Sequence, residues 1–173
     1  TPILTEADDK SRRSAVRQQA TATLKSITHG DEILCPPGLR YLDYQKQAIR
    51  FGLETWGRGT GLLIADEMGL GKTIETIGLI NASPDVVKIL IACPNTLKWV
   101  WRNELDKWLA RPLRVAVQHA GKPWAGDSAD VLIINYELVR RFATELRKTV
   151  WHLRIADEGH YLKNPKTQRT LFT

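Results

Sequence analysis

The stretch "ADEMGLGKT", residues 65–73, constrains the fold more than any other part of the sequence. It joins the apolar run "LLIA" to the segment "KTIETIGLIN", whose apolar spacing predicts a helix. Glycines let backbone N–H groups turn toward an anion, and the amino end of a helix adds positive potential there. A buried strand, this loop and a helix in that order predict a phosphate-binding loop. The alternative is an ordinary turn between a strand and a helix.

The side chains that end this loop fit a nucleoside triphosphate. Lys72 can reach the β- and γ-phosphates, and the Thr73 hydroxyl can ligate Mg²⁺. The strict pattern has a glycine where this chain has Asp66, which is its one departure. The residues predicted to surround the phosphates are Met68, Gly69, Leu70, Gly71, Lys72, Thr73 and Ile74.

Short apolar runs alternate with amphipathic segments along the rest of the chain, which predicts βαβ units and a parallel sheet covered on both faces. Such sheets bind ligands at the carboxyl ends of their strands. Asn95 or Thr96 is the predicted N-cap of the third helix. The predicted strands are 60–66, 86–94, 113–119, 130–136 and 151–158, and the predicted helices are 42–56, 72–81, 95–110 and 137–149.

Residues 1–34 differ from the rest: they are charged and alanine-rich, and they predict a helical extension with a weak apolar stripe. The "CPPG" at 35–38 ends it. Cys35 and Cys93 make no disulfide framework, and Cys93 is expected to be a buried thiol. The histidines and cysteines have no metal-ligand spacing, so a zinc site is not expected.

The net charge of +6 and the pI of about 9.5 favour a polyanionic partner such as nucleic acid, although a merely basic surface explains them equally well. No apolar run approaches the roughly 20 residues that span a bilayer, so we expect no membrane partner. We expect a cytoplasmic or nucleoid-associated protein, or a nuclear one in a eukaryote.

A second motif, "IADEGH" at 155–160, ends the last predicted strand. Asp157 is expected to hold Mg²⁺ through water, and Glu158 to orient and deprotonate an attacking water. Lys72, Asp157 and Glu158 are therefore the predicted catalytic residues, and Thr73 and Asp157 the predicted metal site. The alternative is a solvated acidic pair that caps a helix.

The stretches "DEMGLGKT" and "DEGHYLKNPKTQRT" resemble motifs I and II of the SWI/SNF-type ATPases in helicase superfamily 2. Asp66 is typical of that family, so the departure noted above supports the resemblance. Gly159 replaces the alanine of the family's usual Asp-Glu-Ala-His. The resemblance extends over about residues 39–173 and implies that His160 couples ATP hydrolysis to the rest of the motor.

Other stretches resemble family motifs in the expected order. "LDYQKQAIRF" resembles the Q motif, which implies that Gln45 recognises adenine, although a surface glutamine is the simpler interpretation. "CPNTLKWVWRNELDKW" resembles motif Ia, and its Trp99 and Trp101 are most similar to the annealing-helicase branch. We expect these tryptophans to pack in the core rather than to stack on bases.

The resemblance implies a RecA-like (P-loop NTPase) three-layer α/β/α domain with a mainly parallel sheet. Residues 35–173 would be the first ATPase lobe, ending before motif III, so a second RecA-like lobe is an expected partner. ATP and Mg²⁺ are the implied cofactors, and double-stranded DNA is the implied track. The implied DNA contacts from this lobe are Asn95, Thr96, Lys98 and Tyr136, with Lys163, Asn164 and Lys166 matching a stretch after motif II.

The function implied is a DNA-dependent ATPase that translocates on duplex DNA and remodels protein–DNA or branched DNA structures. Alone, these residues are expected to bind nucleotide weakly and to hydrolyse almost none, because the second lobe completes the site. One alternative is the helicase subunit of a restriction or defence system, or a phage recombination helicase. The other is a degenerate, non-catalytic module that binds DNA or a partner.

Overall fold

The computed structural model describes residues 33–57, 61–62, 64 and 71–159 of the 173-residue chain. They belong to two compact units, which meet in the sequence between Asp85 and Val86 and are considered separately below. Several predictions lie outside the described residues: the helix within 1–34, most of the strand at 60–66, and the roles of Met68, Gly69, Leu70, His160, Lys163, Asn164 and Lys166.

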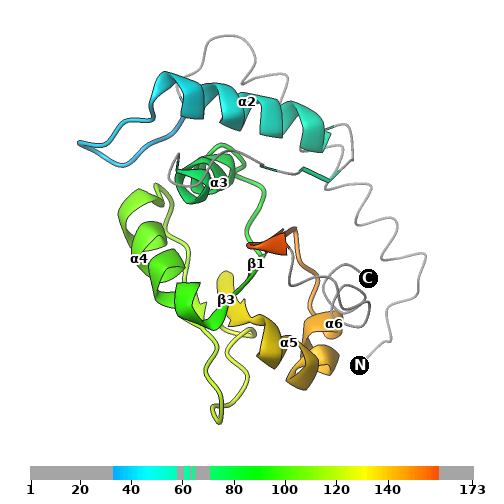
Figure 1. Ribbon diagram of the computed structural model, residues 1–173. Helices are drawn as coiled ribbons and strands as arrows, with labels where there is room; N and C mark the ends of the chain where they lie inside the picture. Colours follow the sequence, from blue (N-terminus) through cyan, green and yellow to red (C-terminus); the bar gives the residue numbers. More distant parts are fainter. Residues whose placement is uncertain (1–32, 58–60, 63, 65–70, 160–173) are drawn as a thin grey trace. The chain divides into compact units, whose positions relative to one another are not determined.

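The first unit contains two helices that pack against each other, α2 (Asp43–Gly57) and α3 (Lys72–Asn81) (Figure 1). Both lie where the apolar spacing predicts them, and α3 begins at the residue predicted for it. Ile49 of α2 and Ile77 of α3 are fully buried in this unit.

Glycines on both helices bring the two backbones close together. A Cβ on Gly52 of α2 would lie 2.8 Å from a side-chain carbon of Leu79, and a Cβ on Gly78 of α3 would clash with the side chain of Ile49. The missing side chains therefore make room for the branched side chains of the facing helix.

The second unit contains a four-stranded sheet whose order is β2-β3-β1-β4. All of its strand pairs are parallel, which confirms the expectation from the alternating apolar runs. Strands β1 and β3 are buried along their whole length, as expected for strands covered on both faces. The strands are β1 (Ile89–Cys93), β2 (Val115–Val117), β3 (Val131–Asn135) and β4 (Leu153–Ala156).

Helices of the second unit differ in two details from the prediction. The segment predicted as one helix over 137–149 is two, α5 (Tyr136–Arg141) and α6 (Ala143–Lys148), because Phe142 leaves helical geometry with φ −103° and ψ 26°. The predicted N-cap was wrong, because Asn95 and Thr96 lie in a 3₁₀ turn, η1 (Asn95–Leu97). Helix α4 (Lys98–Trp108) follows it, and the N-cap residue Leu97 makes no side-chain capping bond.

The apolar side chains of the sheet pack on both of its faces. Helix α4 contacts β2 and β3, whereas α5 contacts β1 and β3, and Figure 1 shows these helices on opposite sides of β3. The cluster on the α5 and α6 side consists of Leu90, Ala92, Leu132, Ile134, Tyr136, Leu138, Val139, Phe142, Leu146 and Trp151. Helix α4 buries Trp101, Leu105 and Trp108. The second unit is therefore a layered α/β structure.

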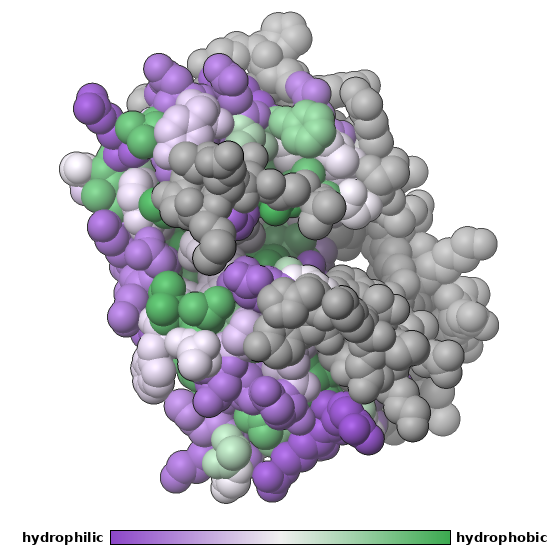
Figure 2. All heavy atoms as spheres, in the orientation of Figure 1, coloured by the Kyte–Doolittle hydropathy of each residue, from purple (hydrophilic) through white to green (hydrophobic). Residues whose placement is uncertain are grey.

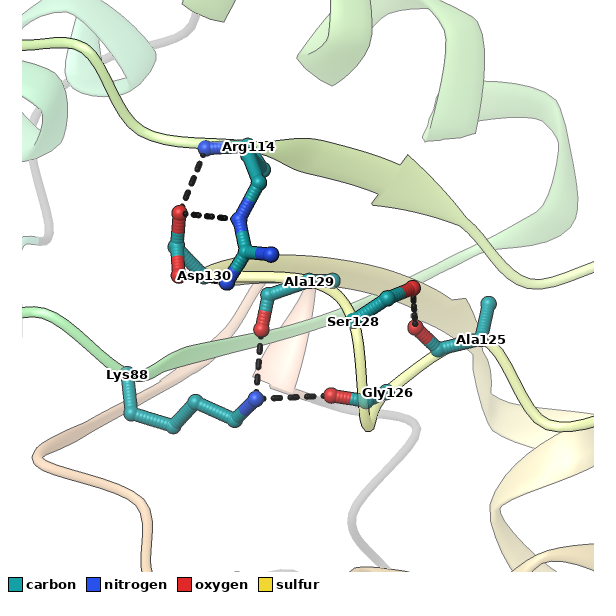
Figure 3. Close-up of polar contacts among 7 residues, drawn as sticks. All are labelled: Lys88, Arg114, Ala125, Gly126, Ser128, Ala129 and Asp130. Atoms are coloured by element: carbon teal, nitrogen blue, oxygen red, sulfur yellow. Dashed lines mark hydrogen bonds and ion pairs between the residues drawn. The ribbon is translucent and has the colours of Figure 1, made fainter.

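Hydrogen bonds and an ion pair stabilise the segments that precede β1, β2 and β3 (Figure 3). Asp130, just before β3, accepts hydrogen bonds from the guanidinium Nε and Nη2 of Arg114, at 3.0 and 2.9 Å, and from its backbone N–H. The Lys88 ammonium, just before β1, donates to the carbonyl oxygens of Gly126 and Ala129. This edge is remote from the strand ends that carry the acidic pair.

Hydrophilic residues are spread over the described surface on the face drawn in Figure 2, and they divide its apolar side chains into small groups. None of the helices in the described residues combines the length and the apolar character that crossing a bilayer requires.

Candidate functional site

The acidic pair lies where parallel strands end together. Asp157 follows the last residue of β4, and its backbone N–H donates to the carbonyl of Ala92 in β1 at 2.9 Å. The next strand pair ends with Cys93 opposite Asn135. Because parallel strands share one carboxyl edge, Asp157 and Asn135 lie at the edge where α/β sheets bind ligands.

Asp157 is held through both its side chain and its backbone. Its Oδ2 accepts a hydrogen bond from the indole Nε1–H of Trp101 at 2.8 Å, and its Oδ1 accepts the backbone N–H of Glu158 at 2.9 Å. Its carbonyl oxygen accepts the hydroxyl of Tyr136 at 2.6 Å. Burial, and then the charge of Asp157, raise the pKa of Tyr136, so this hydroxyl stays a donor at neutral pH.

Glu158 has an unusual backbone conformation. Its φ is +54°, and it is the one non-glycine with a positive φ among the residues that the structure describes. Placing a side chain in this left-handed region costs about 1 kcal/mol, and such residues cluster at functional sites. The carboxylate is exposed, which suits a group that must meet a substrate and a water molecule.

In the first unit, the predicted phosphate contacts stand at the start of a helix. Gly71 is the N-cap residue of α3, and its φ of +92° requires a glycine there. Lys72, Thr73 and Ile74 form the first turn and are half-buried. The backbone N–H groups of a first helical turn have no partner within their helix, so this turn can bind an anion.

Gln45 belongs to the same unit and reaches this turn. It is 4% exposed, its Oε1 accepts the backbone N–H of Leu42 at 3.0 Å, and its Nε2 lies 2.7 Å from where a Cβ on Gly71 would be. The bond to Leu42 is the part of a capping box in which the third helical residue binds back to the N-cap. The interpretation as a surface glutamine is therefore wrong, and adenine recognition by its amide stays a prediction.

The four residues predicted to contact DNA fall into two classes. Asn95 and Thr96 are exposed in η1, directly after β1. Lys98 and Tyr136 are buried, at 5% and 7% exposure, and both form internal hydrogen bonds. Burial favours an internal role for the second pair.

A buried polar network around Lys98 was not predicted from the sequence. The Lys98 ammonium donates to Asn135 Oδ1 at 3.0 Å and to the carbonyl of Gln118 at 3.2 Å. Asn135 donates in turn to Glu137, and this bond lowers the pKa of the Glu137 carboxyl. These bonds provide the partners that a buried charge requires. They also connect the start of α4 to the ends of β2 and β3.

The tryptophans of motif Ia differ in burial. Trp101 and Trp108 are buried, as predicted, but Trp99 is 57% exposed and its ring centroid lies 5.7 Å from that of His119. Helical spacing explains the difference, because Trp101 and Trp108 are seven residues apart and share one face, while Trp99 faces away. Cys93 is fully buried, as predicted, and burial raises the pKa of its thiol to about 12.

The side-chain oxygens of Thr73 and Asp157 suit Mg²⁺, which prefers hard oxygen ligands. Each carboxylate oxygen of Asp157 accepts one hydrogen bond from the described residues and has two acceptor positions, so each can still accept one from a metal-bound water. Asp157 therefore fits the indirect metal contact predicted for it. Thr73 belongs to the first unit, and its hydroxyl is a second oxygen ligand that Mg²⁺ accepts.

The SNF2-related domain family matches residues 44–173, which include the loop, α2 with Gln45, and the acidic pair. The chain belongs to this family. It is thus a SWI/SNF-type ATPase of helicase superfamily 2, in the part that corresponds to the first RecA-like lobe.

Curated relatives agree with this family assignment. The DNA repair and recombination protein RAD54B of Mus musculus is 33% identical over 161 residues, which cover 81% of the SNF2 chain and 18% of that protein. RAD54 of Saccharomyces cerevisiae is 38% identical over 133 residues, which cover 60% of this chain and 15% of that protein. The SWI/SNF-related matrix-associated actin-dependent regulator of chromatin subfamily A-like protein 1 of Bos taurus is 33% identical over 130 residues, covering 74% and 13%. The SNF2 chain spans less than a fifth of these relatives.

Solved structures support the fold. The Sulfolobus solfataricus SWI2/SNF2 ATPase core in complex with dsDNA matches with a TM-score of 0.69 and 28% identity, covering 81% of the SNF2 chain and 31% of that one. The Sulfolobus solfataricus SWI2/SNF2 ATPase core domain matches with a TM-score of 0.67 and 26% identity, covering 83% of this chain and 31% of that one. The fold is therefore RecA-like α/β, as predicted.

Proposed function

We propose that the chain is the ATP-binding lobe of a DNA-dependent ATPase that translocates on double-stranded DNA and remodels protein–DNA or branched DNA structures. The observation that carries the proposal is the family match over residues 44–173, in which neither nucleotide motif has lost a reactive side chain. Lys72, Thr73, Asp157 and Glu158 are all present, which argues against a degenerate binding module.

Each motif would make its own contribution at a shared site. Lys72 and the first turn of α3 would bind the phosphates, while Asp157 would hold the waters of Mg²⁺. Bound Mg²⁺ would offset phosphate charge during transfer. Glu158 would accept a proton from the attacking water, and its exposed, left-handed position at the strand end supports that role. The convergence of these groups on one triphosphate is part of the proposal.

DNA contact is proposed for Asn95 and Thr96, which are exposed at the carboxyl edge of the sheet. One solved neighbour is the Sulfolobus solfataricus SWI2/SNF2 ATPase core in complex with dsDNA, which supports a duplex as the track. A second RecA-like lobe is the proposed partner that completes the ATP site. We therefore propose that these 173 residues alone bind nucleotide weakly and hydrolyse almost none.

The test uses the full-length gene product, with ATP hydrolysis measured with and without duplex DNA. Triplex displacement then reports translocation, and fork strand displacement reports unwinding. We expect DNA-stimulated hydrolysis and triplex displacement without unwinding, and we expect Lys72→Ala to lower both activities at least about 100-fold. Lys46 is a half-buried lysine paired with Asp43 in the same unit, so Lys46→Ala is the matched control and should change neither activity.

Two results would contradict the proposal. Efficient strand separation would favour a helicase subunit of the restriction, defence or phage recombination type. An absence of ATP binding in the unaltered protein would favour the degenerate module.

A further inference from the structure

The indole of Trp101 in α4 donates its N–H to the carboxylate of Asp157, a residue 56 positions away in the sequence. The Nε1–Oδ2 distance is 2.8 Å, and the bond is partly buried because Trp101 is only 3% exposed. A partly buried hydrogen bond to a charged acceptor is stronger than one between neutral groups at the surface. This bond selects the orientation of the Asp157 side chain.

The backbone of Asp157 is anchored independently of that bond. Its N–H donates to Ala92 of β1, and its carbonyl accepts the hydroxyl of Tyr136 at the start of α5. With the Cα held from two elements, the remaining freedom of Asp157 is rotation of its side chain. The indole of Trp101, from a third element, α4, removes this freedom together with the backbone N–H of Glu158.

An indole suits this task better than other donors. Its N–H can only donate, so it cannot turn to offer an acceptor to the carboxylate. It carries no charge, so it leaves the full negative charge of Asp157 for a cation, whereas a lysine or arginine would neutralise it. One acceptor position on each carboxylate oxygen stays open to a metal-bound water.

We propose that Trp101 is a positioning residue for the magnesium carboxylate, Asp157. From α4, it fixes the orientation of the carboxylate oxygens that would accept hydrogen bonds from the waters of a bound Mg²⁺. That helix follows η1, where Asn95 and Thr96 are exposed, so a shift of this segment would change the metal site through one hydrogen bond. The inference rests on the proposed function, because it assumes that Asp157 binds Mg²⁺.

The test compares Trp101→Phe with Trp108→Phe in the full-length gene product. Both substitutions remove an indole from the buried face of α4. Of these two tryptophans, Trp101 is the one that donates a hydrogen bond to Asp157 in the described residues. Binding of a fluorescent, non-hydrolysable ATP analogue is measured as Mg²⁺ is raised. We expect Trp101→Phe to raise the Mg²⁺ concentration for half-maximal binding about 10-fold, as the loss of a hydrogen bond to a metal-binding carboxylate does, with metal-free binding unchanged. Trp108→Phe should follow the parent protein.

A spectroscopic arm tests the hydrogen bond without any nucleotide. The protein is labelled with ¹⁵N-tryptophan, and the resonance lost in Trp101→Phe identifies the Trp101 indole N–H. We expect this resonance to move, and its hydrogen exchange to accelerate, in Asp157→Ala but not in Trp108→Phe. Trp101→Phe is used in this experiment only to assign the resonance. Thermal unfolding of Trp101→Phe checks that the variant is folded when the assignment is made.

The outcomes separate the two proposals. A Trp101 resonance that ignores Asp157→Ala, or a Mg²⁺ titration of Trp101→Phe that coincides with that of Trp108→Phe, would overturn the positioning role alone. A parent protein whose analogue binding does not respond to Mg²⁺ would overturn the proposed function, and the positioning role with it.

Discussion

The side-chain amide of Gln45 lies against Gly71, the last residue before α3: its Nε2 is 2.7 Å from where a Cβ on Gly71 would stand. The same amide caps α2 through Leu42. One side chain thus connects the start of one helix to the start of the other within the first unit. Removing the Gln45 side chain, or adding a side chain at Gly71, should therefore disturb the starts of both helices.

Gly71→Ala should destabilise the first unit for two reasons. A residue with a Cβ at φ +92° costs about 1 kcal/mol, and the new methyl group also displaces the Gln45 amide. Chemical unfolding measures the loss. Gly38→Ala is the matched control, because its φ is +80° but nothing lies within 4 Å of its Cβ position. Equal losses in the two variants would contradict a role for the Gln45 contact.

Gln45→Glu separates capping from base recognition. A carboxylate oxygen can still accept the Leu42 N–H, so the stability of α2 should be kept, but the amide donor is lost. If the amide reads adenine, the preference for ATP over GTP should fall at least about 10-fold, as expected for a lost polar contact to a base. The ratio of the two dissociation constants measures it. An unchanged ratio would restrict Gln45 to capping.

Lys98→Met tests whether this lysine is internal. The substitution leaves Asn135 Oδ1 and the Gln118 carbonyl without their donor, so unfolding should become easier by roughly 1–3 kcal/mol. Duplex binding should keep its salt dependence, because a lost phosphate contact would reduce the slope of log K against log salt by about one. Lys107→Met, on the exposed side of α4, controls for stability. A slope reduced by one unit in Lys98→Met would identify a DNA contact.

Asp130→Asn should reveal a pH-dependent part of the stability. The hydrogen bond from Arg114 is the largest cause that lowers the pKa of Asp130. A carboxyl whose folded pKa lies below its unfolded value of about 3.9 stabilises the fold above that value, and the gain is lost as pH falls through the folded pKa.

The Tm difference between parent and Asp130→Asn should therefore be full at neutral pH, at roughly 2–4 °C, and shrink below about pH 4. Arg114→Gln removes the same pair from the other side and should show the same pH profile. A Tm difference that stays constant down to pH 3 would contradict the assignment.

Much of the fold could be predicted because the sequence patterns are local. The start of α3 followed from the glycine before Lys72, and the parallel strands followed from short, fully apolar runs such as β1 and β3. The break in the helix predicted over 137–149 could not be predicted from the local pattern. Phe142 breaks a predicted helix although its neighbours have helical spacing, because packing into the core overrides propensity.

The candidate site was predictable in its residue types but not in its partners. The acidic pair and the loop follow from short motifs, whereas the bond from Trp101 to Asp157 joins residues 56 apart. No periodicity encodes such a contact, because it depends on the register of β4 against β1 and on where α4 crosses the sheet. The burial of Lys98 has the same origin, since a lysine beside exposed residues gives no local sign of an internal acceptor.

The central claim is that the loop before α3 and the acidic pair after β4 act on one bound ATP. It is tested most directly by a single-turnover measurement of ATP hydrolysis on duplex DNA, with the full-length gene product and its Glu158→Gln variant. We predict that Glu158→Gln binds ATP as tightly as the parent, through Lys72, but hydrolyses it at least about 100-fold more slowly. Hydrolysis by Glu158→Gln at the parent rate would contradict it.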